Sequence, residues 1–202
     1  MTQVTQSDHL PLVLASSSPF RRELLSRLGL EFSTSSPDVD ESRLKDESAE
    51  ALVLRLSQQK AMAVAESHPE ALIIGSDQVA TVDGEILGKP GNHEKAIEQL
   101  LNASGKKVTF YTGLTLHNSK TGRNQTCCEP FHVQFRTLNR SEIENYLLKE
   151  QPYNCAGSFK SEGLGISLFE YMEGADPNAL IGLPLIRLNT MLRQEGVDIL
   201  AQ

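Results

Sequence analysis

The chain has 202 residues, of which 39% are hydrophobic and 22% charged, and these proportions are typical of a globular protein. Its formal net charge of −7 argues against a nucleic-acid polymer as partner, because domains that bind such polymers carry a basic face. No apolar run reaches the ~20 residues that a membrane span needs, so no membrane partner is expected. Residues 1–9 are polar and lack the apolar stretch of a secretory signal. We therefore expect a cytoplasmic protein with a single domain over 1–202, in which about 1–9 form an N-terminal extension.

The first predicted elements are a buried strand over 11–15 and a helix over 19–28. Between them lie three serines and a proline, and Ser18 fits the N-cap position because its side chain can accept from the free N–H groups of the first turn. Arg21 and Arg22 add two cations to that turn, where the helix dipole is also positive. Arginine forks match phosphate oxygens well. The pattern favours a polyphosphate site, although an ordinary strand-to-helix turn with solvated arginines would look the same.

The pattern then predicts, in chain order, a strand over 31–36, an acidic loop over 37–47, a helix over 49–67, a strand over 71–76 that continues over 78–82, a turn at 83–84, a helix over 93–103, an antiparallel pair over 107–117 and 126–136, a helix opened by a capping box at 141–144 and ending near 149, strands over 155–159 and 165–169, and a helix over 184–193. These elements indicate a mixed α/β domain, and two lobes around a cleft are one arrangement of it.

Asp77 lies at the end of a buried apolar run, in Gly75-Ser76-Asp77-Gln78. Aspartate is depleted inside strands, so its presence there needs a reason. A carboxylate at a strand end can bind a divalent cation or take a proton from an attacking water. The alternative is a turn aspartate that bonds nearby backbone N–H groups.

Three acids, Asp38, Asp40 and Glu41, lie in the loop after the second strand. They could share a hard cation with Asp77 if the fold brings the two segments together. Their spacing matches no metal motif, and an acidic loop that is simply solvated is the alternative.

Two lysines and one small-residue segment are further candidates. Lys60 lies in a helix that otherwise faces the core, and Lys89 follows the predicted turn, so either can meet a phosphate or simply lie at the surface. The segment 155–165 places small residues around Lys160 and Glu162, and small residues let a ligand approach the backbone closely. In a strand these two charged side chains would face the same side, which is either a cleft or solvent.

Taken together, these motifs resemble the Maf family of nucleoside triphosphate pyrophosphatases, over about residues 12–193. The matching motifs are the serine-proline-arginine segment at 16–25, Asp40-Glu41, Lys60-Ala61, Gly75-Ser76-Asp77, Gly88-Lys89-Pro90, Tyr111-Thr112-Gly113 and Gly157-Ser158-Phe159. The resemblance implies a Maf/inosine-triphosphatase-like α/β fold, a mixed sheet with flanking helices and a central cleft. It also implies hydrolysis of a nucleoside triphosphate, as a small-molecule substrate, to the monophosphate and diphosphate with a divalent cation, Mg²⁺ or Mn²⁺.

The resemblance carries the family's functional positions onto this chain residue by residue. The phosphate-binding positions fall on Ser16, Arg21, Arg22, Lys60 and Lys89, the metal positions on Glu41 and Asp77, and the catalytic proton acceptor also on Asp77. The residues alone leave open whether Asp77 acts as a base or as a metal ligand.

Three positions resemble the subfamily that hydrolyses 7-methyl-GTP, namely Phe20, Gln78 and Glu162, where members that cleave dTTP and UTP have other residues. Methylation at N7 puts a positive charge on guanine and strengthens its stacking on an aromatic ring. A carboxylate such as that of Glu162 can accept from N1–H and the 2-amino group together, and Gln78 can read another edge atom. Uracil and thymine would set carbonyl groups against that carboxylate.

Two other functions remain open from the sequence. One is a pyrophosphatase for dTTP, UTP or other modified nucleotides. The other is a non-catalytic nucleotide sensor that regulates cell division, as the family's older description as septum-formation inhibitors suggests. The clustering of acids with phosphate-binding cations favours an enzyme, because a sensor has less need of Asp77. No feature of the sequence decides for or against a homodimer.

Overall fold

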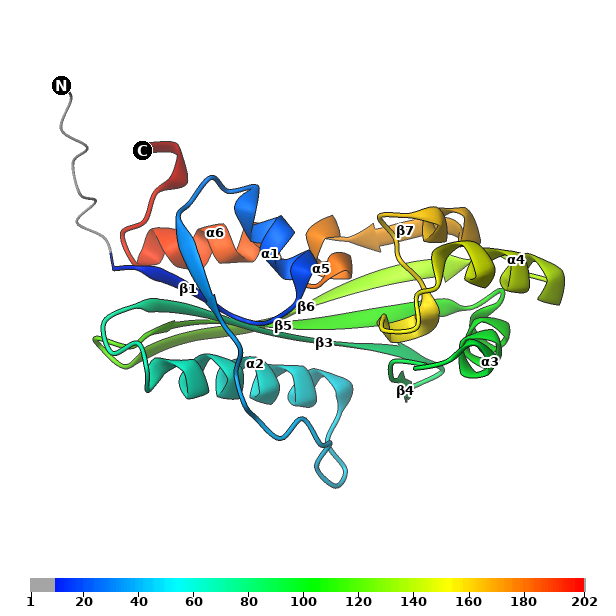
Figure 1. Ribbon diagram of the computed structural model, residues 1–202, viewed down its shortest axis with the longest axis horizontal. Coiled ribbons are helices and arrows are strands. Elements are labelled where there is room, and N and C mark those ends of the chain that lie inside the picture. Colours follow the sequence, from blue (N-terminus) through cyan, green and yellow to red (C-terminus); the bar gives the residue numbers. More distant parts are fainter. Residues whose placement is uncertain (1–9, 202) are drawn as a thin grey trace.

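The structure is a computed structural model that describes residues 10–201, so the extension expected over about 1–9 lies outside the described residues. Within them, seven strands form one mixed sheet in the order β2-β1-β3-β5-β6-β7, and β4 pairs with β3 (Figure 1). The strands are β1 (Leu12–Ala15), β2 (Phe32–Ser35), β3 (Leu72–Val82), β4 (Glu85–Leu87), β5 (Lys107–Asn118), β6 (Arg123–Phe135) and β7 (Phe169–Gly174). The α-helices are α1 (Pro19–Ser26), α2 (Ala49–Ala65), α3 (His93–Ala103), α4 (Arg140–Glu150), α5 (Pro177–Ile181) and α6 (Leu185–Gln194), and the short 3₁₀ helices are η1 (Ala156–Ser158), η2 (Leu164–Leu168) and η3 (Ile199–Ala201).

The sheet combines a parallel and an antiparallel half. β1 pairs in parallel with both β2 and β3, whereas β3, β5, β6 and β7 follow one another as antiparallel neighbours. The parallel half needs crossover helices, and α1 and α2 supply them. Helix α2 lies along one face of the sheet, while α1, α5 and α6 lie over the other (Figure 1).

Side chains that alternate along the parallel strands supply a core on each face. Leu14 and Ile74 pack with α1 and α6, whereas Val13 and Ile73 pack with α2. A larger cluster joins α3 and α4 to the far end of the long antiparallel strands. Helix α2 lies so close to the sheet that a Cβ at Gly75 would come within 2.1 Å of a backbone oxygen of α2. The glycine there therefore sets the distance between α2 and β3.

The edge of β3 that faces β1 and β4 is open over residues 76–79. On this edge β1 pairs with β3 only as far as Ala15 opposite Gly75, and β4 begins to pair at Ala80 opposite Leu87. The other edge of β3 pairs with β5 throughout. Because successive side chains of a strand point to opposite faces, residues 76–79 can serve both faces of the sheet at this opening.

Most predicted elements are confirmed, but the segment after α4 differs. The strands expected over 155–159 and 165–169 are wrong, because these residues form the 3₁₀ helices η1 and η2, and β7 begins only at Phe169. Gly157 and Ser158 have φ of +75° and +63°, which no strand permits. The capping box is formed by Asn139 with Glu142, two residues before the expected start. In residues 10–201 no helix is long and apolar enough to cross a membrane.

Candidate active site

A cavity of about 690 Å³ lies at the open edge of β3. Its walls come from the end of β1 and the start of α1, from β3, from α2, from the end of α5 and from the segment 151–162. This volume lies within the range of small-molecule sites, about 300–1,000 Å³. The lining includes most of the residues predicted from the sequence, namely Ser16, Phe20, Arg21, Glu41, Lys60, Asp77, Gln78, Lys89 and Glu162.

Of the predicted phosphate-binding residues, Arg22 does not line the cavity. It is exposed, whereas Arg21 lines the cavity. Successive residues of a helix are turned by about 100° from one another, so Arg22 leaves the helix in a different direction from Arg21. The predicted phosphate contact of Arg22 therefore has no support in the geometry. Asp38 and Asp40 also lie outside the lining, and only Glu41 of that acidic loop reaches the cavity.

On the α2 side of β3, one ammonium group joins two carboxylates. Nζ of Lys60 lies 2.6 Å from Oδ1 of Asp77 and 2.6 Å from Oε1 of Glu41. Lys60 and Asp77 are buried, with 7% and 11% of their side-chain surfaces exposed, whereas the Glu41 side chain is 59% exposed. Burying a lysine is costly unless it is paired. The two acids thus explain why Lys60 can be buried on the side of α2 that faces the core.

Further cations reach the same group of charges. The contact with Lys60 lowers the pKa of the Glu41 carboxyl, and the charges of Lys89 and Arg21 act in the same direction. Burial lowers the pKa of the Arg21 guanidinium, and the negative charges of Asp77 and Glu41 oppose that effect. An arginine stays protonated in proteins even so. The cavity therefore holds a fixed, desolvated cation next to two acids, in a setting suited to a phosphate chain.

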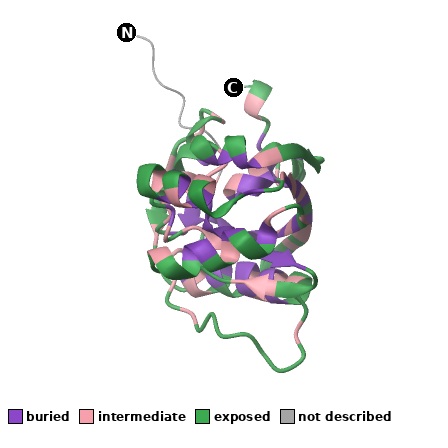
Figure 2. Ribbon diagram, turned by 90° about the vertical axis from the view of Figure 1, so that its right-hand side faces the viewer, coloured by how far each residue is buried: buried purple, intermediate pink, exposed green. Residues whose placement is uncertain are grey.

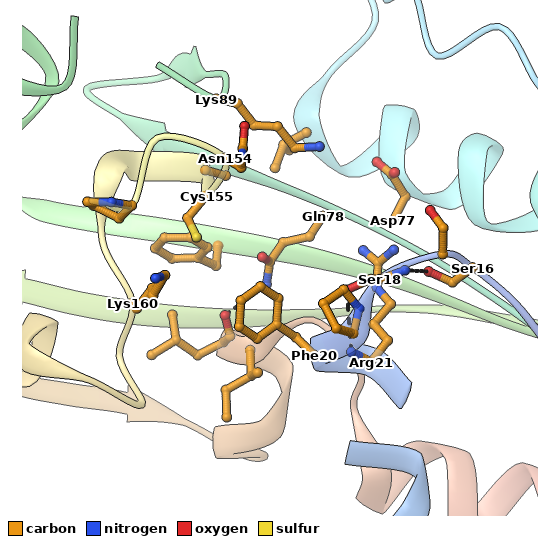
Figure 3. A pocket seen from close by; sticks show the side chains of 18 of the residues that line it. Ser16, Ser18, Phe20, Arg21, Asp77, Gln78, Lys89, Asn154, Cys155 and Lys160 are labelled. Atoms are coloured by element: carbon orange, nitrogen blue, oxygen red, sulfur yellow. Dashed lines mark hydrogen bonds between the residues drawn. The ribbon is translucent and has the colours of Figure 1, made fainter. Parts of the chain in front are cut away.

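The start of α1 forms as the sequence predicts. Ser18 is the N-cap, its Oγ accepts from the N–H of Arg21 at 3.4 Å, and Pro19 occupies the first helical position. Oγ of Ser16 in turn accepts from the N–H of Ser18 at 3.1 Å. The Arg21 guanidinium points towards Asp77 (Figure 3), and its Nε donates to the carbonyl oxygen of Gly182 at 2.9 Å. That contact holds the arginine in place and leaves its two terminal nitrogens for a ligand.

The other side of β3 carries the residues predicted to recognise a base. Gln78 points away from α2 towards α5 and lies near Phe20 (Figure 3). Glu162 approaches from the segment 151–162, and it is exposed at the mouth of the cavity. The alternation of β3 thus separates the two tasks, with Asp77 on the face of the acids and Gln78 on the face of the aromatic ring.

Two carboxylates can hold a divalent cation here. Mg²⁺ in nucleotide-hydrolysing sites is usually bound by one or two carboxylates together with substrate phosphates and water. Glu41 and Asp77 both contact the Lys60 ammonium, which occupies the point between them, so a divalent cation would bind their remaining oxygens beside Lys60. The residues described, 10–201, include no group of three or more His, Cys, Asp or Glu side chains placed to hold an ion by themselves. This donor set fits a cation that is shared with a phosphate chain.

Sequence reasoning missed several residues of the lining, chiefly Asn154, Cys155 and Ile181. Asn154 directly precedes the segment predicted as a strand and Cys155 begins it, and no periodicity there marks a turn that faces a ligand. Ile181 ends α5, a helix of five residues that is too short to give a helical period. Asp176 and Pro177 at its start are an N-cap signal that could have identified it.

Known proteins resemble this chain over nearly its whole length. Residues 11–195 match the family described as Maf-like protein. The 7-methyl-GTP pyrophosphatase of Alcanivorax borkumensis is 61% identical over 194 residues, which make up 96% of this chain and 98% of that protein. The protein of the same name from Pseudomonas aeruginosa is 60% identical over 188 residues, or 93% and 98% of the two chains.

Among solved structures, the Ham1 protein of Staphylococcus aureus resembles the fold with a TM-score of 0.53 at 13% identity, over 92% of this chain and 99% of that one. A likeness at this identity concerns the fold alone, and it confirms the mixed sheet with flanking helices that the sequence resemblance implied. The family match and the high identities decide the relationship: this chain belongs to the Maf family.

Proposed function

We propose that the chain is a nucleoside triphosphate pyrophosphatase that hydrolyses 7-methyl-GTP to 7-methyl-GMP and diphosphate. The observation that carries the proposal is the convergence of Asp77, Lys60, Glu41 and Arg21 on one cavity, with an aromatic ring and an acid at its other side. The names of the relatives that are about 60% identical support the choice of substrate.

The proposed reaction begins with a water molecule that attacks the α-phosphorus, while Asp77 accepts its proton. Lys60 contacts Oδ1 of Asp77, and among residues 10–201 the other oxygen, Oδ2, has no hydrogen-bond partner and can face that water. Arg21, Lys60 and Lys89 stabilise the negative charge that grows on the departing diphosphate, as fixed cations do in phosphoryl transfer. A divalent cation, Mg²⁺ or Mn²⁺, held by Glu41 and Asp77 would add charge neutralisation at the phosphate oxygens.

The base is recognised on the opposite side of β3. Phe20 offers a ring to the positively charged 7-methylguanine, and stacking of a cation on an aromatic face is favourable. Glu162 accepts from N1–H and the 2-amino group. The single domain over 1–202 and the cytoplasmic location stay predictions from the sequence.

A panel assay of diphosphate release tests this function. The purified chain is incubated with 7-methyl-GTP, GTP, dTTP and UTP, each with Mg²⁺, with Mn²⁺ and with a chelator. We expect 7-methyl-GTP to give the highest kcat/KM and the chelator to abolish release. Glu98 is exposed on α3 and does not line the cavity. The variant Glu98→Gln therefore serves as a control for the effects of mutation and purification, and it should behave like the unmodified chain.

Two outcomes of the panel would contradict the proposal. Faster hydrolysis of dTTP or UTP would assign the chain to the other substrate class. Binding of nucleotides without diphosphate release at any metal concentration would make it a nucleotide sensor.

A further inference from the structure

The side-chain amide of Gln78 is held from one side by three acceptors. Its Nε2 donates to the carbonyl oxygen of Ala179 at 2.7 Å, to that of Leu180 at 3.1 Å and to Oγ1 of Thr112 at 3.0 Å. An amide nitrogen has two N–H groups, so these acceptors use both of them. Turning the amide over would set its oxygen against two backbone carbonyl oxygens. The three acceptors therefore fix the orientation of the Gln78 amide, with its nitrogen towards them and its oxygen away from them.

Thr112 fixes this arrangement from the neighbouring strand. It lies directly opposite Gln78 in the pairing of β3 with β5, and it is fully buried. Its hydroxyl donates to the carbonyl oxygen of Ala179 at 2.8 Å. A hydroxyl has one hydrogen, so towards Gln78 the Thr112 oxygen acts only as an acceptor. The hydroxyl thus binds the nitrogen end of the amide.

Two side chains of the cavity, Gln78 and Glu162, therefore present hydrogen-bond acceptors to a base. Gln78 is half-buried and lines the cavity, and with its nitrogen occupied only Oε1 remains for a ligand. The ionised carboxylate of Glu162 also only accepts. Lys160 lies in the same wall, and its Nζ donates to the main-chain oxygen of Glu150 at 3.2 Å and pairs with the Glu150 carboxylate at 3.5 Å, which leaves one of its three N–H groups. In Figure 3 Gln78 lies between Phe20 and Cys155, where a flat ring would stack on the phenyl group.

We propose that Thr112 is a positioning residue that holds Gln78 as a hydrogen-bond acceptor, and that the cavity thereby selects bases with an exocyclic 2-amino group. The inference rests on the proposed function and deepens it. Once Glu162 has taken N1–H and one amino hydrogen, the second amino hydrogen is the donor that remains on the edge of 7-methylguanine. The carbonyl oxygen O6 cannot pair with an Oε1 that only accepts. Uracil, thymine and hypoxanthine lack this amino group altogether.

The test compares 7-methyl-GTP with 7-methylinosine triphosphate, which lacks only the 2-amino group. We expect the unmodified chain to prefer 7-methyl-GTP by at least about tenfold in kcat/KM, since a buried acceptor left without its donor is costly. Thr112→Val removes the hydroxyl at nearly constant shape and leaves the carbonyl oxygens of Ala179 and Leu180 in place, so it should reduce that preference without abolishing it, through KM more than through kcat. Thr112→Ser restores the hydroxyl and should restore the preference, which a loss of packing alone would not do.

A second measurement does not depend on the variants being folded. In the unmodified chain, both Nε2 protons of Gln78 should exchange with water more slowly in an NMR experiment than those of the exposed Gln151. Equal rates would overturn the inference, and so would a Thr112→Val chain that keeps its full preference. If the chain hydrolyses both substrates equally, the inference fails while the proposed function stands. If neither substrate yields diphosphate, the proposed function itself fails.

Discussion

Asp77 has the surroundings that a proton acceptor in the hydrolysis of an anhydride requires. It is buried beside a cation, and its second oxygen is available to a water molecule. Nζ of Lys60 lies 2.6 Å from one oxygen of this carboxylate, and the Asp77 side chain is buried on the α2 side of β3. The Asp77 oxygen that does not contact Lys60 is the position at which the proton of the attacking water would be accepted. Glu41 is the second carboxylate that contacts Lys60, and its side chain is largely exposed.

Replacing Asp77 by asparagine keeps the shape of the side chain and removes its basicity. We expect Asp77→Asn to lower kcat for 7-methyl-GTP by about 10²–10⁴-fold while nucleotide binding persists. Steady-state kinetics and calorimetric titration with the nucleotide separate the two effects. The Glu98→Gln control should retain its kcat. An Asp77→Asn chain that turns over at the rate of the unmodified one would show that the proton acceptor lies elsewhere.

At the scale of elements, the loop that carries Glu41 is tied down from its far end. Arg55 of α2 donates from Nε to Oε1 of Glu47 at 2.7 Å and from Nη2 to Oε2 at 2.8 Å, which is a bidentate pair. The N–H of Leu44 donates to Glu47 as well, at 3.0 Å. The loop projects from the body of the molecule and is largely exposed (Figure 2). The Arg55–Glu47 pair therefore gives the exposed loop a fixed path past Lys60.

This pair makes stability depend on pH in a defined window. The hydrogen bonds from Arg55, and then that from Leu44, lower the pKa of Glu47 from 4.5 to about 2. Such a group stabilises the folded chain above its ordinary pKa, and the contribution is lost as the pH falls from about 4.5 towards 2. We expect Glu47→Gln to lower the free energy of unfolding by a constant amount above pH ~5 and by less at lower pH. Urea unfolding of both chains at several pH values measures the difference, and a gap that does not narrow in acid would contradict this account.

The elements also show how far the sequence predicts the molecule. Long periodic helices such as α2 and the hairpin of β5 and β6 were predicted within two or three residues, because each buries one regular face. The segment 151–168 was not, since it is held by an aromatic cluster around Phe159 and by the contacts of Glu150, which no local pattern reveals. For the site, the resemblance supplied most of the charged residues that line the cavity, but not Asn154, Ile181 or the surroundings of Gln78. The contacts of Gln78 with Ala179 and Leu180 join residues about a hundred positions apart, and only the fold brings them together.

Across the whole molecule, the open edge of β3 determines what the cavity can do. Pairing with β1 stops at Gly75 and pairing with β4 starts at Ala80, so a ligand can reach both faces of the sheet at one place. The acids and Lys60 then lie on the α2 face, while Gln78 and Phe20 lie on the other. A nucleotide fits this division, with its phosphates among the cations and its base beside the ring. We expect the α-phosphorus, which is the phosphorus closest to the nucleoside, to lie at the boundary between the two faces and to be the one attacked.

Hydrolysis of 7-methyl-GTP in ¹⁸O-labelled water tests this assignment most directly, with mass spectrometry of both products. Attack at the α-phosphorus places the label in 7-methyl-GMP and leaves the diphosphate unlabelled, which is the result that we expect. Label in the diphosphate would place the attack at the β-phosphorus, and release of inorganic phosphate would show cleavage at another bond. Either result would contradict the placement of the substrate across the open edge of β3.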